Sequence, residues 1–501
     1  MASYVVVPKT LNINEIENKG FALSPSLFKS VEIKNQNVKK VKDLLDRALK
    51  PKDKGFEVGS KSYIYNSKYF FIRTKALQPT SFLPNYDRES IVPILPQSFK
   101  NYNLKEGDIL ISKDSNIGEV VILDKDLPTY MPSGGIYRLL VSNWKYYLLA
   151  FIKNDFFKTQ LNFLVSRGAT IRHAKTLFLD CLIPFPNQEN SNNIINYIEF
   201  LTKAIINKEK EIRKKHKLIL EKIEKELLEN QKPSEFEYKR PTLKELKSLS
   251  RINATIYDTY FKKEEFLIKN YIHGVKNIYD LGFDISRGQN LQVSAIGKSI
   301  YSKARKNGFY TLILPKNLSY YGTIIKYEFL GNKNKLKTLK KGDIVFGAEG
   351  FEKGRSIVVT KELTRTITNI HGMTLNLQEG DLTISIFVKC FLDYLRKKGL
   401  IDIYAVGGNG GSLAQKYWYM IPFPNFPESK QKEIAELYYN SVDYPTNLNL
   451  NNFLEEDTKW NKKAGILQLD LSAKKLKERL NEVIHKIVMD EEVQIDFEVI
   501  K

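Results

Sequence analysis

One long helical stretch constrains the fold of this chain more than any other feature. Residues 186–231 contain no glycine and, after the first position, no proline, and Lys, Glu, Leu and Ile dominate them, which favours a helix. Ile198, Ile205, Ile212 and Ile219 recur every seven residues, as in helices that pack along another helix. About 40 residues at about 1.5 Å each give a rod of roughly 60 Å. Such a rod must join or space two bodies, unless it serves only as a dimerising coiled coil.

The charge of the chain indicates a polyanionic partner. Its 501 residues include 78 Lys and Arg against 57 Asp and Glu, a formal net charge of +21. An excess of this size favours nucleic acid over a membrane surface. Cys181 and Cys390 lie far apart among apolar residues, which is typical of buried free thiols in a reducing compartment. Without a signal peptide or a long uncharged apolar run, the chain is expected to be soluble and cytoplasmic.

The two halves of the sequence repeat one order of motifs. LKEGDILIS (104–112) parallels LKKGDIVFG (339–347), and IPFPN occurs at 183–187 and again at 421–425. The interval between the GDI and IPFPN motifs is nearly the same in both halves. We therefore predict an internal duplication in which a globule is followed by a helix, twice.

Each globule is expected to mix strands and helices. The short apolar runs at 55–130 are typical of strands. Residues 144–164 and 383–400 have the apolar pattern of helices, and a short amphipathic helix is expected within 31–51. The predicted fold class is therefore α/β of the mixed α+β kind.

The two repeated motifs favour architecture over chemistry. Gly107 and Gly342 offer an unhindered backbone, and Asp108 and Asp343 can cap a turn before a strand. The prolines of IPFPN stiffen the exit from a globule into a helix. We interpret both motifs as structural.

Polar and basic loops in matching places of the two halves are the candidate DNA contacts. One loop precedes IPFPN in each half, another follows each GD strand, and SRGQN at 286–290 adds a third. Arg, Asn and Gln can read base edges, and Lys neutralises phosphate, although a solvated loop position is the alternative for any single residue. The predicted DNA-binding residues are Lys113, Ser115, Asn116, Arg167, Arg172, His173, Lys175, Arg287, Gln289, Asn290, Lys353, Arg355, Asn409, Ser412, Gln415 and Lys416.

Indications of catalysis are weak. GGNGGSLAQK and GAEGFEKGRS fail the P-loop pattern. The five histidines are scattered and make no metal-ligand spacing with the cysteines. Neither a paired-carboxylate nuclease motif nor the Asn/Asp-Pro-Pro-aromatic motif of adenine methyltransferases is present. We therefore expect no catalytic, cofactor or metal site.

Together these features resemble the specificity (S) subunit of type I restriction-modification systems. The resemblance covers essentially the whole chain and rests on the duplication, the GDI pair, the IPFPN-to-helix junctions and RINATIYDTYF at 251–261. SRGATIRHAKTLFLDCLIPFPN (166–187) resembles the end of a target-recognition domain. Two departures stand out: FALSPSLFKS (21–30) parallels RINATIYDTYF only loosely, and the second helix is interrupted at 441–466.

The resemblance implies two target-recognition domains and two long helical spacers. The spacers would run antiparallel and form a coiled coil within a pseudo-twofold repeat. We expect the first recognition domain at 1–187, the first spacer at 188–240, the second domain at 241–427 and the second spacer at 428–501, with an inserted loop at about 441–466.

The resemblance also implies a non-catalytic subunit. Each domain would read one half of a bipartite double-stranded DNA site, and the helices would set the spacing and dock two methyltransferase subunits. Those partners would bind S-adenosylmethionine, flip an adenine and methylate it, whereas ATP and Mg²⁺ would belong to a restriction or translocase subunit. Three alternatives stay open: a specificity subunit of a related methylation or defence system with different partners, a nuclease with an unrecognised site, and a scaffold that binds no DNA.

Overall fold

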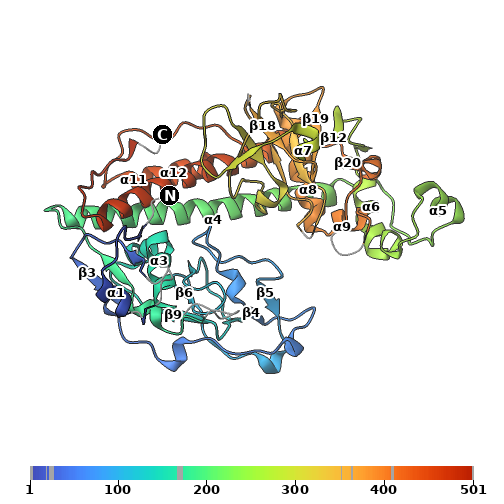
Figure 1. Ribbon diagram of the computed structural model, residues 1–501. Coiled ribbons are helices and arrows are strands. Elements are labelled where there is room, and N and C mark those ends of the chain that lie inside the picture. The colour runs from blue at the N-terminus through green and yellow to red at the C-terminus, as the bar shows by residue number, and fades with distance from the viewer. Residues whose placement is uncertain are drawn as a thin grey trace. The chain divides into compact units, whose positions relative to one another are not determined.

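In the computed structural model, the long helix predicted from the sequence is α4, Ser191–Glu229 (Figure 1). All four isoleucines of its seven-residue repeat are buried. The structure describes residues 4–18, 20–21, 28–165, 173–350, 352–362, 365–407 and 411–498.

The chain forms two units, and each is assembled from segments that are distant in the sequence. Helix α4 contributes its first part to unit 1 and the rest to unit 2, and α12 (Ile466–Val488) also belongs to both. Unit 1 comprises residues 1–210, 443–462 and 471–501, and unit 2 comprises residues 211–442 and 463–470.

Two small sheets form the centre of unit 1. In one, β6 lies between β7 and β9 and is antiparallel to both; in the other, β4 pairs antiparallel with β5 and parallel with β8. Every residue of β6 and β7 is buried, which explains why all of them except Ser112 are apolar. The strands are β4 (Phe70–Ile72), β5 (Ile91–Pro93), β6 (Ile109–Ser112), β7 (Val120–Ile122), β8 (Tyr130–Pro132) and β9 (Ile136–Leu139).

Unit 2 repeats these pairings. Strand β16 lies between β17 and β19, antiparallel to both, and β14 pairs antiparallel with β15 and parallel with β18. β12 and β13 extend the two sheets to four strands each. This shared pairing confirms the predicted duplication. The strands are β12 (Phe283–Arg287), β13 (Ile300–Ser302), β14 (Tyr310–Ile313), β15 (Glu328–Gly331), β16 (Ile344–Gly347), β17 (Ser356–Val358), β18 (Thr366–Thr368) and β19 (Gly372–Leu377).

The GDI motifs form the predicted turns before β6 and β16. Gly107 and Gly342 have φ values of +83° and +89°, a conformation that glycine adopts without strain. The backbone N–H of Lys105 donates to the Asp108 carboxylate at 2.9 Å, and in unit 2 the same bond runs to Asp343 at 2.8 Å. The structural interpretation of this motif is therefore confirmed.

Each IPFPN segment closes an antiparallel two-stranded ribbon. In unit 1, β10 (Leu182–Pro184) pairs with β3 (Val38–Lys40). In unit 2, β20 (Phe423–Pro424) pairs with β11 (Val275–Lys276). Proline is tolerated here because each of these strands has a single partner. A third ribbon joins β1 (Val5–Val6) to β2 (Ser30–Val31).

Further helices cover the sheets. The predicted helix at 144–164 is two helices, because Asn154 ends α2 and caps α3 by accepting the Phe156 N–H at 2.8 Å. In unit 2, α8 packs against α10 and β17. The remaining helices are α1 (Ile13–Glu17), α2 (Lys145–Lys153), α3 (Asp155–Leu164), α5 (Leu243–Leu249), α6 (Thr259–Lys269), α7 (Val293–Ile296), α8 (Leu382–Lys397), α9 (Leu400–Tyr404) and α10 (Glu428–Tyr438).

Within unit 1, the first part of α4 and the last part of α12 share one apolar core, to which Ile198 and Leu480 both belong. Asn187, just before α4, donates to Asp490 beyond the end of α12 at 2.7 Å. Glu209, further along α4, pairs with Lys477 of α12, also at 2.7 Å. The two helices therefore run in opposite directions in this unit.

Two local predictions are wrong. The segment at 441–466 is not only a loop, because it contains α11 (Phe453–Lys463), whose buried face includes Asp457 and Trp460. The helix expected within 31–51 is absent: this stretch forms β3 and a short 3₁₀ turn, Val41–Leu44. In both places a distant segment decides the local structure, since α11 is anchored by Lys208 of α4 and β3 by β10.

Candidate nucleic-acid interface

Predicted contacts of the first half gather at one edge of the β7-β6-β9 sheet. Two backbone hydrogen bonds bring them together: Lys113 N donates to Gly135 O, and Ala174 N donates to Lys113 O, both at 2.8 Å. The loop after β6 and the loop before β10 therefore meet. We call residues 113–116 and 173–175 the β6 edge.

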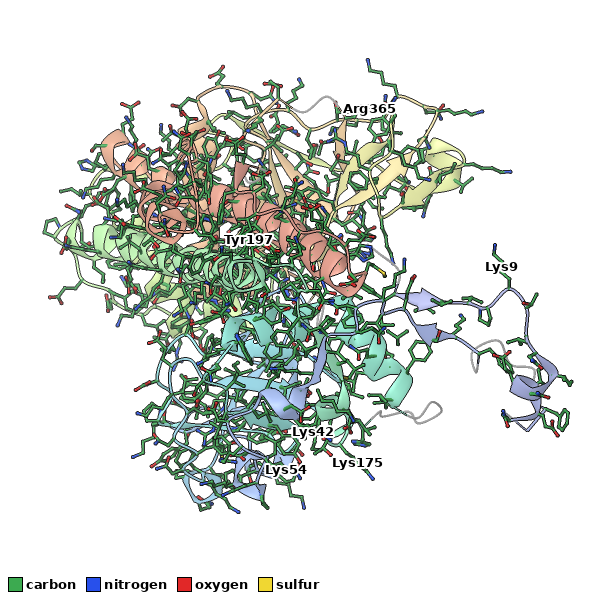
Figure 2. All side chains as sticks on the ribbon, turned by 90° about the vertical axis from the view of Figure 1, so that its left-hand side faces the viewer. Lys9, Lys42, Lys54, Lys175, Tyr197 and Arg365 are labelled. Carbon is green, nitrogen blue, oxygen red and sulfur yellow. The ribbon has the colours of Figure 1, made fainter. Side chains whose placement is uncertain are left out.

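The side chains of the β6 edge differ in their solvent exposure and in their hydrogen bonds. Lys175 is exposed and extends away from unit 1 (Figure 2), and Ser115 is exposed as well. Asn116 donates to the backbone oxygen of Leu77 at 3.3 Å and so holds the loop in place. His173 exposes 56% of its side chain. Two further predicted contacts, Arg167 and Arg172, lie outside the described residues.

Unit 2 builds the corresponding edge in the same way. Leu413 N donates to Ala348 O at 2.9 Å, as Ala174 N does to Lys113 O. The pairing of Arg287 with Met373 and of Gly347 with Gly372 brings the end of β12 and the end of β16 to this place. We call residues 287–290, 348–350, 369–371 and 411–413 the β16 edge.

Four predicted residues lie at the β16 edge: Arg287, Gln289, Asn290 and Ser412. Gln289 accepts the Lys337 N–H at 3.0 Å and donates to the backbone oxygen of its own neighbour, Asn290, at 3.2 Å. The first bond ties the SRGQN segment to the loop before β16, and Gln289 N donates to Thr368 O of β18 at 2.8 Å.

The other predicted residues of unit 2 lie elsewhere or are engaged. Lys353 is almost fully buried and pairs with Asp402 at 2.8 Å. Arg355 exposes 16% of its side chain and pairs with Glu352 at 2.6 Å. Gln415 donates to Ile285 O at 2.6 Å, Lys416 lies 5.0 Å from the ring centroid of Tyr417, and Asn409 is outside the described residues.

Each edge also carries an acidic residue, and sequence reasoning missed the one in the first half, Asp114. Asp114 and Glu349 occupy the same position after their GDI motifs. Asp114 bonds Nδ1 of His173 at 2.7 Å and also pairs with Lys113. Aligning the two GDI segments and extending them by two residues would have revealed the shared acidic position.

Glu349 makes the same kind of arrangement in unit 2. Its Oε1 pairs with Arg287 Nη1 at 2.7 Å, and its Oε2 bonds Nδ1 of His371 at 2.8 Å. The sequence predicts His371 to be a hydrogen-bonded histidine at the end of a strand, and it is one, although it exposes 63% of its side chain. Each edge therefore carries a carboxylate between a cation and an imidazole.

Both carboxylates are held in the ionised form. Burial acts to raise the pKa of Asp114, but hydrogen bonds from Lys113 and His173 outweigh it, and the pKa is lowered from its ordinary value. For Glu349, burial again acts to raise the pKa, and the bonds from His371 and Arg287 lower it. The negative charge of the carboxylate at each edge is thus stabilised by hydrogen bonds from adjacent donors.

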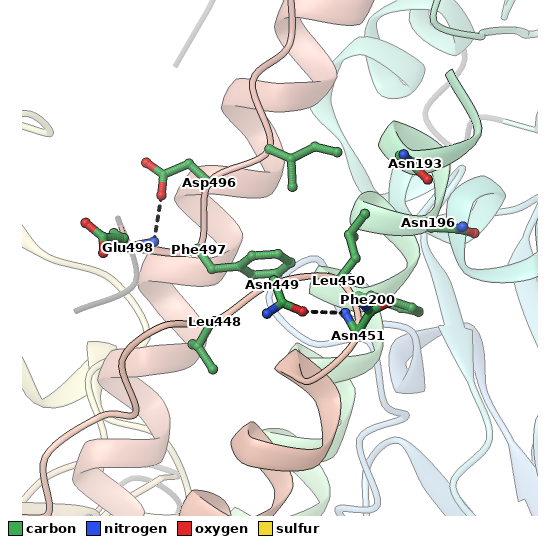
Figure 3. Close-up of a pocket in the computed structure, with 11 residues that line it drawn as sticks. Asn193, Asn196, Phe200, Leu448, Asn449, Leu450, Asn451, Asp496, Phe497 and Glu498 are labelled. Carbon is green, nitrogen blue, oxygen red and sulfur yellow. Dashed lines mark hydrogen bonds between the residues drawn. The ribbon is translucent and has the colours of Figure 1, made fainter. Parts of the chain in front are cut away.

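A pocket in unit 1 has a different character (Figure 3). It has a volume of about 580 Å³ and is lined by α4, by residues 448–451 and by residues 495–498. Asp496 accepts the Glu498 N–H at 2.7 Å, and Asn449 accepts the Asn451 N–H at 2.8 Å. The lining includes two carboxylates and neither Lys nor Arg, so this pocket does not suit a polyanion.

Within the ranges that the structure describes, no group of three or more His, Cys, Asp or Glu side chains is placed to hold a metal ion. Cys181 and Cys390 are buried free thiols, as predicted, and burial raises the pKa of each to about 12. None of the described helices combines the length and apolar character needed to cross a membrane.

Comparison with known proteins gives a family match over part of the chain. Residues 33–215 match the family described as the type I restriction modification DNA specificity domain. A search of curated proteins finds no match. The β6 edge lies within the matched residues.

Similar solved structures have low identity to this chain. The S subunit of the type I restriction-modification system from M. genitalium is 15% identical, with 89% of this chain and 95% of that chain covered and a TM-score of 0.39. The HsdS subunit from Thermoanaerobacter tengcongensis is 13% identical, with 90% and 96% covered and a TM-score of 0.26.

Residues 33–215 therefore form a DNA specificity domain of the kind found in type I restriction-modification systems. Subunits of this family determine the DNA sequence on which the system acts and are themselves non-catalytic. The family thus implies no cofactor bound by this chain, and it implies DNA and a methyltransferase as partners.

Proposed function

We propose that the two units read the two halves of a bipartite DNA site. The β6 edge contacts one half-site and the β16 edge the other. The observation that carries the proposal is the repeated strand pairing, which brings the loop after the central strand and the loop before IPFPN together in each unit. Loops held on a rigid sheet are suited to base recognition.

The contacting residues are those of the two edges, with their flanking polar side chains. Lys175 and Ser115 are exposed in unit 1. Arg287 exposes 38% of its side chain in unit 2. We propose that all the residues predicted from the sequence belong to the DNA-binding surface. Lys353 and Arg355 contribute indirectly, because their ion pairs with Asp402 and Glu352 hold the loop in which they lie.

The domain limits expected from the sequence complete the proposal. Residues 1–187 and 241–427 are the recognition domains, and 188–240 and 428–501 are the spacers. The spacers form an antiparallel coiled coil whose length sets the gap between the half-sites. Support comes from the buried isoleucine repeat of α4 and from the opposite directions of α4 and α12 within unit 1.

The partners follow from this arrangement. Two methyltransferase subunits dock on the repeated spacers, bind S-adenosylmethionine and methylate a flipped adenine in each half-site. Restriction or translocase subunits supply the sites for ATP and Mg²⁺. The complex works on double-stranded DNA in the cytoplasm. A net charge of +21 speeds encounter with DNA and makes affinity strongly dependent on salt.

A domain exchange tests the proposal. Replacing residues 1–187 by the first recognition domain of another specificity subunit is expected to change one half of the methylated motif and leave the other half and the gap unchanged. The reciprocal exchange of 241–427 is the matched control and should change the opposite half. Motif sequencing after expression with the methyltransferase measures both. If one exchange altered both halves, the assignment of one half-site to each unit would be wrong.

A further inference from the structure

The two edges carry the same three-part arrangement, although the duplication did not simply copy it. The carboxylates are equivalent, since Asp114 and Glu349 take the same position after β6 and β16. The histidines are not. In the pairing of the sheets, His371 takes the place of Gly135, whereas His173 takes the place of Ser412.

The cations also come from different places. Lys113 is the neighbour of Asp114 in sequence, whereas Arg287 reaches Glu349 from the end of β12. The same set of groups, a carboxylate with a cation and an imidazole, thus occurs at equivalent places in both units, although the cation and the histidine come from non-equivalent segments. A purely structural role in a duplicated fold would be served by equivalent residues, so the shared chemistry points to a shared ligand.

The hydrogen bonds decide which atom of each imidazole faces a ligand. Both rings bond their carboxylate through Nδ1, at 2.7 Å for His173 and 2.8 Å for His371. More than half of each histidine side chain is exposed. Fixing Nδ1 on the carboxylate orients the ring and leaves Nε2 to meet the ligand.

We propose that His173 and His371 contact DNA phosphates through Nε2, and that Asp114 and Glu349 are the positioning residues of these contacts. An imidazolium donates from both ring nitrogens, so Nδ1–H can stay on the carboxylate while Nε2–H donates to a phosphate oxygen. A carboxylate near DNA would otherwise repel the backbone. Here it is offset by two adjacent donors, and with its imidazole protonated each arrangement carries a net positive charge.

The inference rests on the proposed function, because it needs these edges to face DNA. The charged groups that meet the rings are Asp114 and Lys113 for His173, and Glu349 and Arg287 for His371, with Lys175 two residues from His173. A phosphate contact is independent of base sequence, so a duplex of random sequence serves as the probe.

The test measures the affinity of the full chain for a labelled random-sequence duplex against pH and salt. His371→Gln, and the double variant with His173→Gln, are compared with His273→Gln, which removes an exposed histidine of unit 2 outside the β16 edge. Wild type and His273→Gln should bind more tightly as the pH falls from 8 to 6. Each edge substitution should weaken binding at pH 6 by roughly tenfold and lower the salt slope by about 0.9.

The variant Glu349→Gln distinguishes the positioning role of Glu349 from the phosphate contact made by His371. It keeps an acceptor for Nδ1–H and removes the negative charge of Glu349, so the dependence of affinity on pH should differ from that of wild type. Edge variants that match wild type at every pH would overturn the inference, and so would weaker binding with an unchanged salt slope. Failure of wild type to bind any duplex at low salt would overturn the proposed function together with it.

Discussion

Deleting one heptad from α4 is expected to shorten the gap between the two half-sites by up to roughly three base pairs. Seven residues contribute about 10 Å of helix, and each base pair adds about 3.4 Å. Residues 209–215 are suited to the deletion, because they span the passage of α4 between the two units and leave Lys208 and His216 in place. The isoleucine stripe keeps its face, since the repeat is also seven residues.

The matched control keeps the length and changes the charge. Alanine at Lys210, Arg213 and Lys214 should weaken binding at most and leave the gap unchanged. A companion variant that also lacks residues 467–473 of α12 shortens both helices equally. Sequencing of the methylated motif measures the gap in each case. A deletion variant that still methylates the original motif at its original spacing would show that the helices do not measure the site.

Replacing Asp457 by Leu is expected to destabilise unit 1 by about 3–5 kcal/mol, because it leaves a buried charge without its partner. Lys208 of α4 and Asp457 of α11 form an ion pair with both side chains 0% exposed. Asn461 accepts from the same ammonium at 2.7 Å, and Trp460 lies 4.7 Å from it. This cluster ties the inserted helix α11 to the spacer.

The double substitution of Lys208→Met with Asp457→Leu is the control and should cost far less, since apolar replacement of a buried pair is often nearly neutral. Burial lowers the pKa of Lys208 to about 8, and loss of Asp457 should lower it further. The folded variant then binds fewer protons than folded wild type below pH 8. Its stability deficit should therefore shrink as the pH rises to about 8 and stay constant above. Calorimetric unfolding of unit 1 measures the deficit, and equal losses in single and double variants would contradict the buried-pair explanation.

The parts of the fold that could be predicted were those with local causes. The isoleucine repeat of α4 and the absence of glycine define a helix without reference to the rest of the chain. The GDI turns need only a glycine at positive φ and an aspartate cap, as Gly342 and Asp343 show. The GDI motif recurs, and IPFPN follows it at nearly the same interval in both halves, so the duplication could be predicted as well.

The errors have a common physical cause in contacts between distant segments. Residues 31–51 have helical periodicity, yet β3 pairs with β10, and this pairing overrides local preference. The helix α11 was missed because a charged residue, Asp457, lies on its buried face. Only its pairing with Lys208, far away in sequence, makes that burial favourable.

In the candidate site too, local sequence predicted some features, whereas others depend on contacts between distant segments. Loop composition identified Lys113, His173 and Arg287 as candidates, and the structure places them at the two edges. Loop composition did not identify Asp114, because an acidic residue looks unsuited to a DNA-binding surface until its hydrogen-bond donors are known. One of them, His173, comes from another loop, so its meeting with Asp114 is a property of the folded sheet.

Whether this chain directs methylation to a split DNA site is tested most directly by methylome sequencing of a host that expresses its methyltransferase partner with and without the chain. The predicted result is one adenine-methylated motif of two short halves separated by a fixed gap, present only when the chain is expressed. Absence of any new motif, or a single undivided one, would contradict the proposal that two recognition units read one bipartite site.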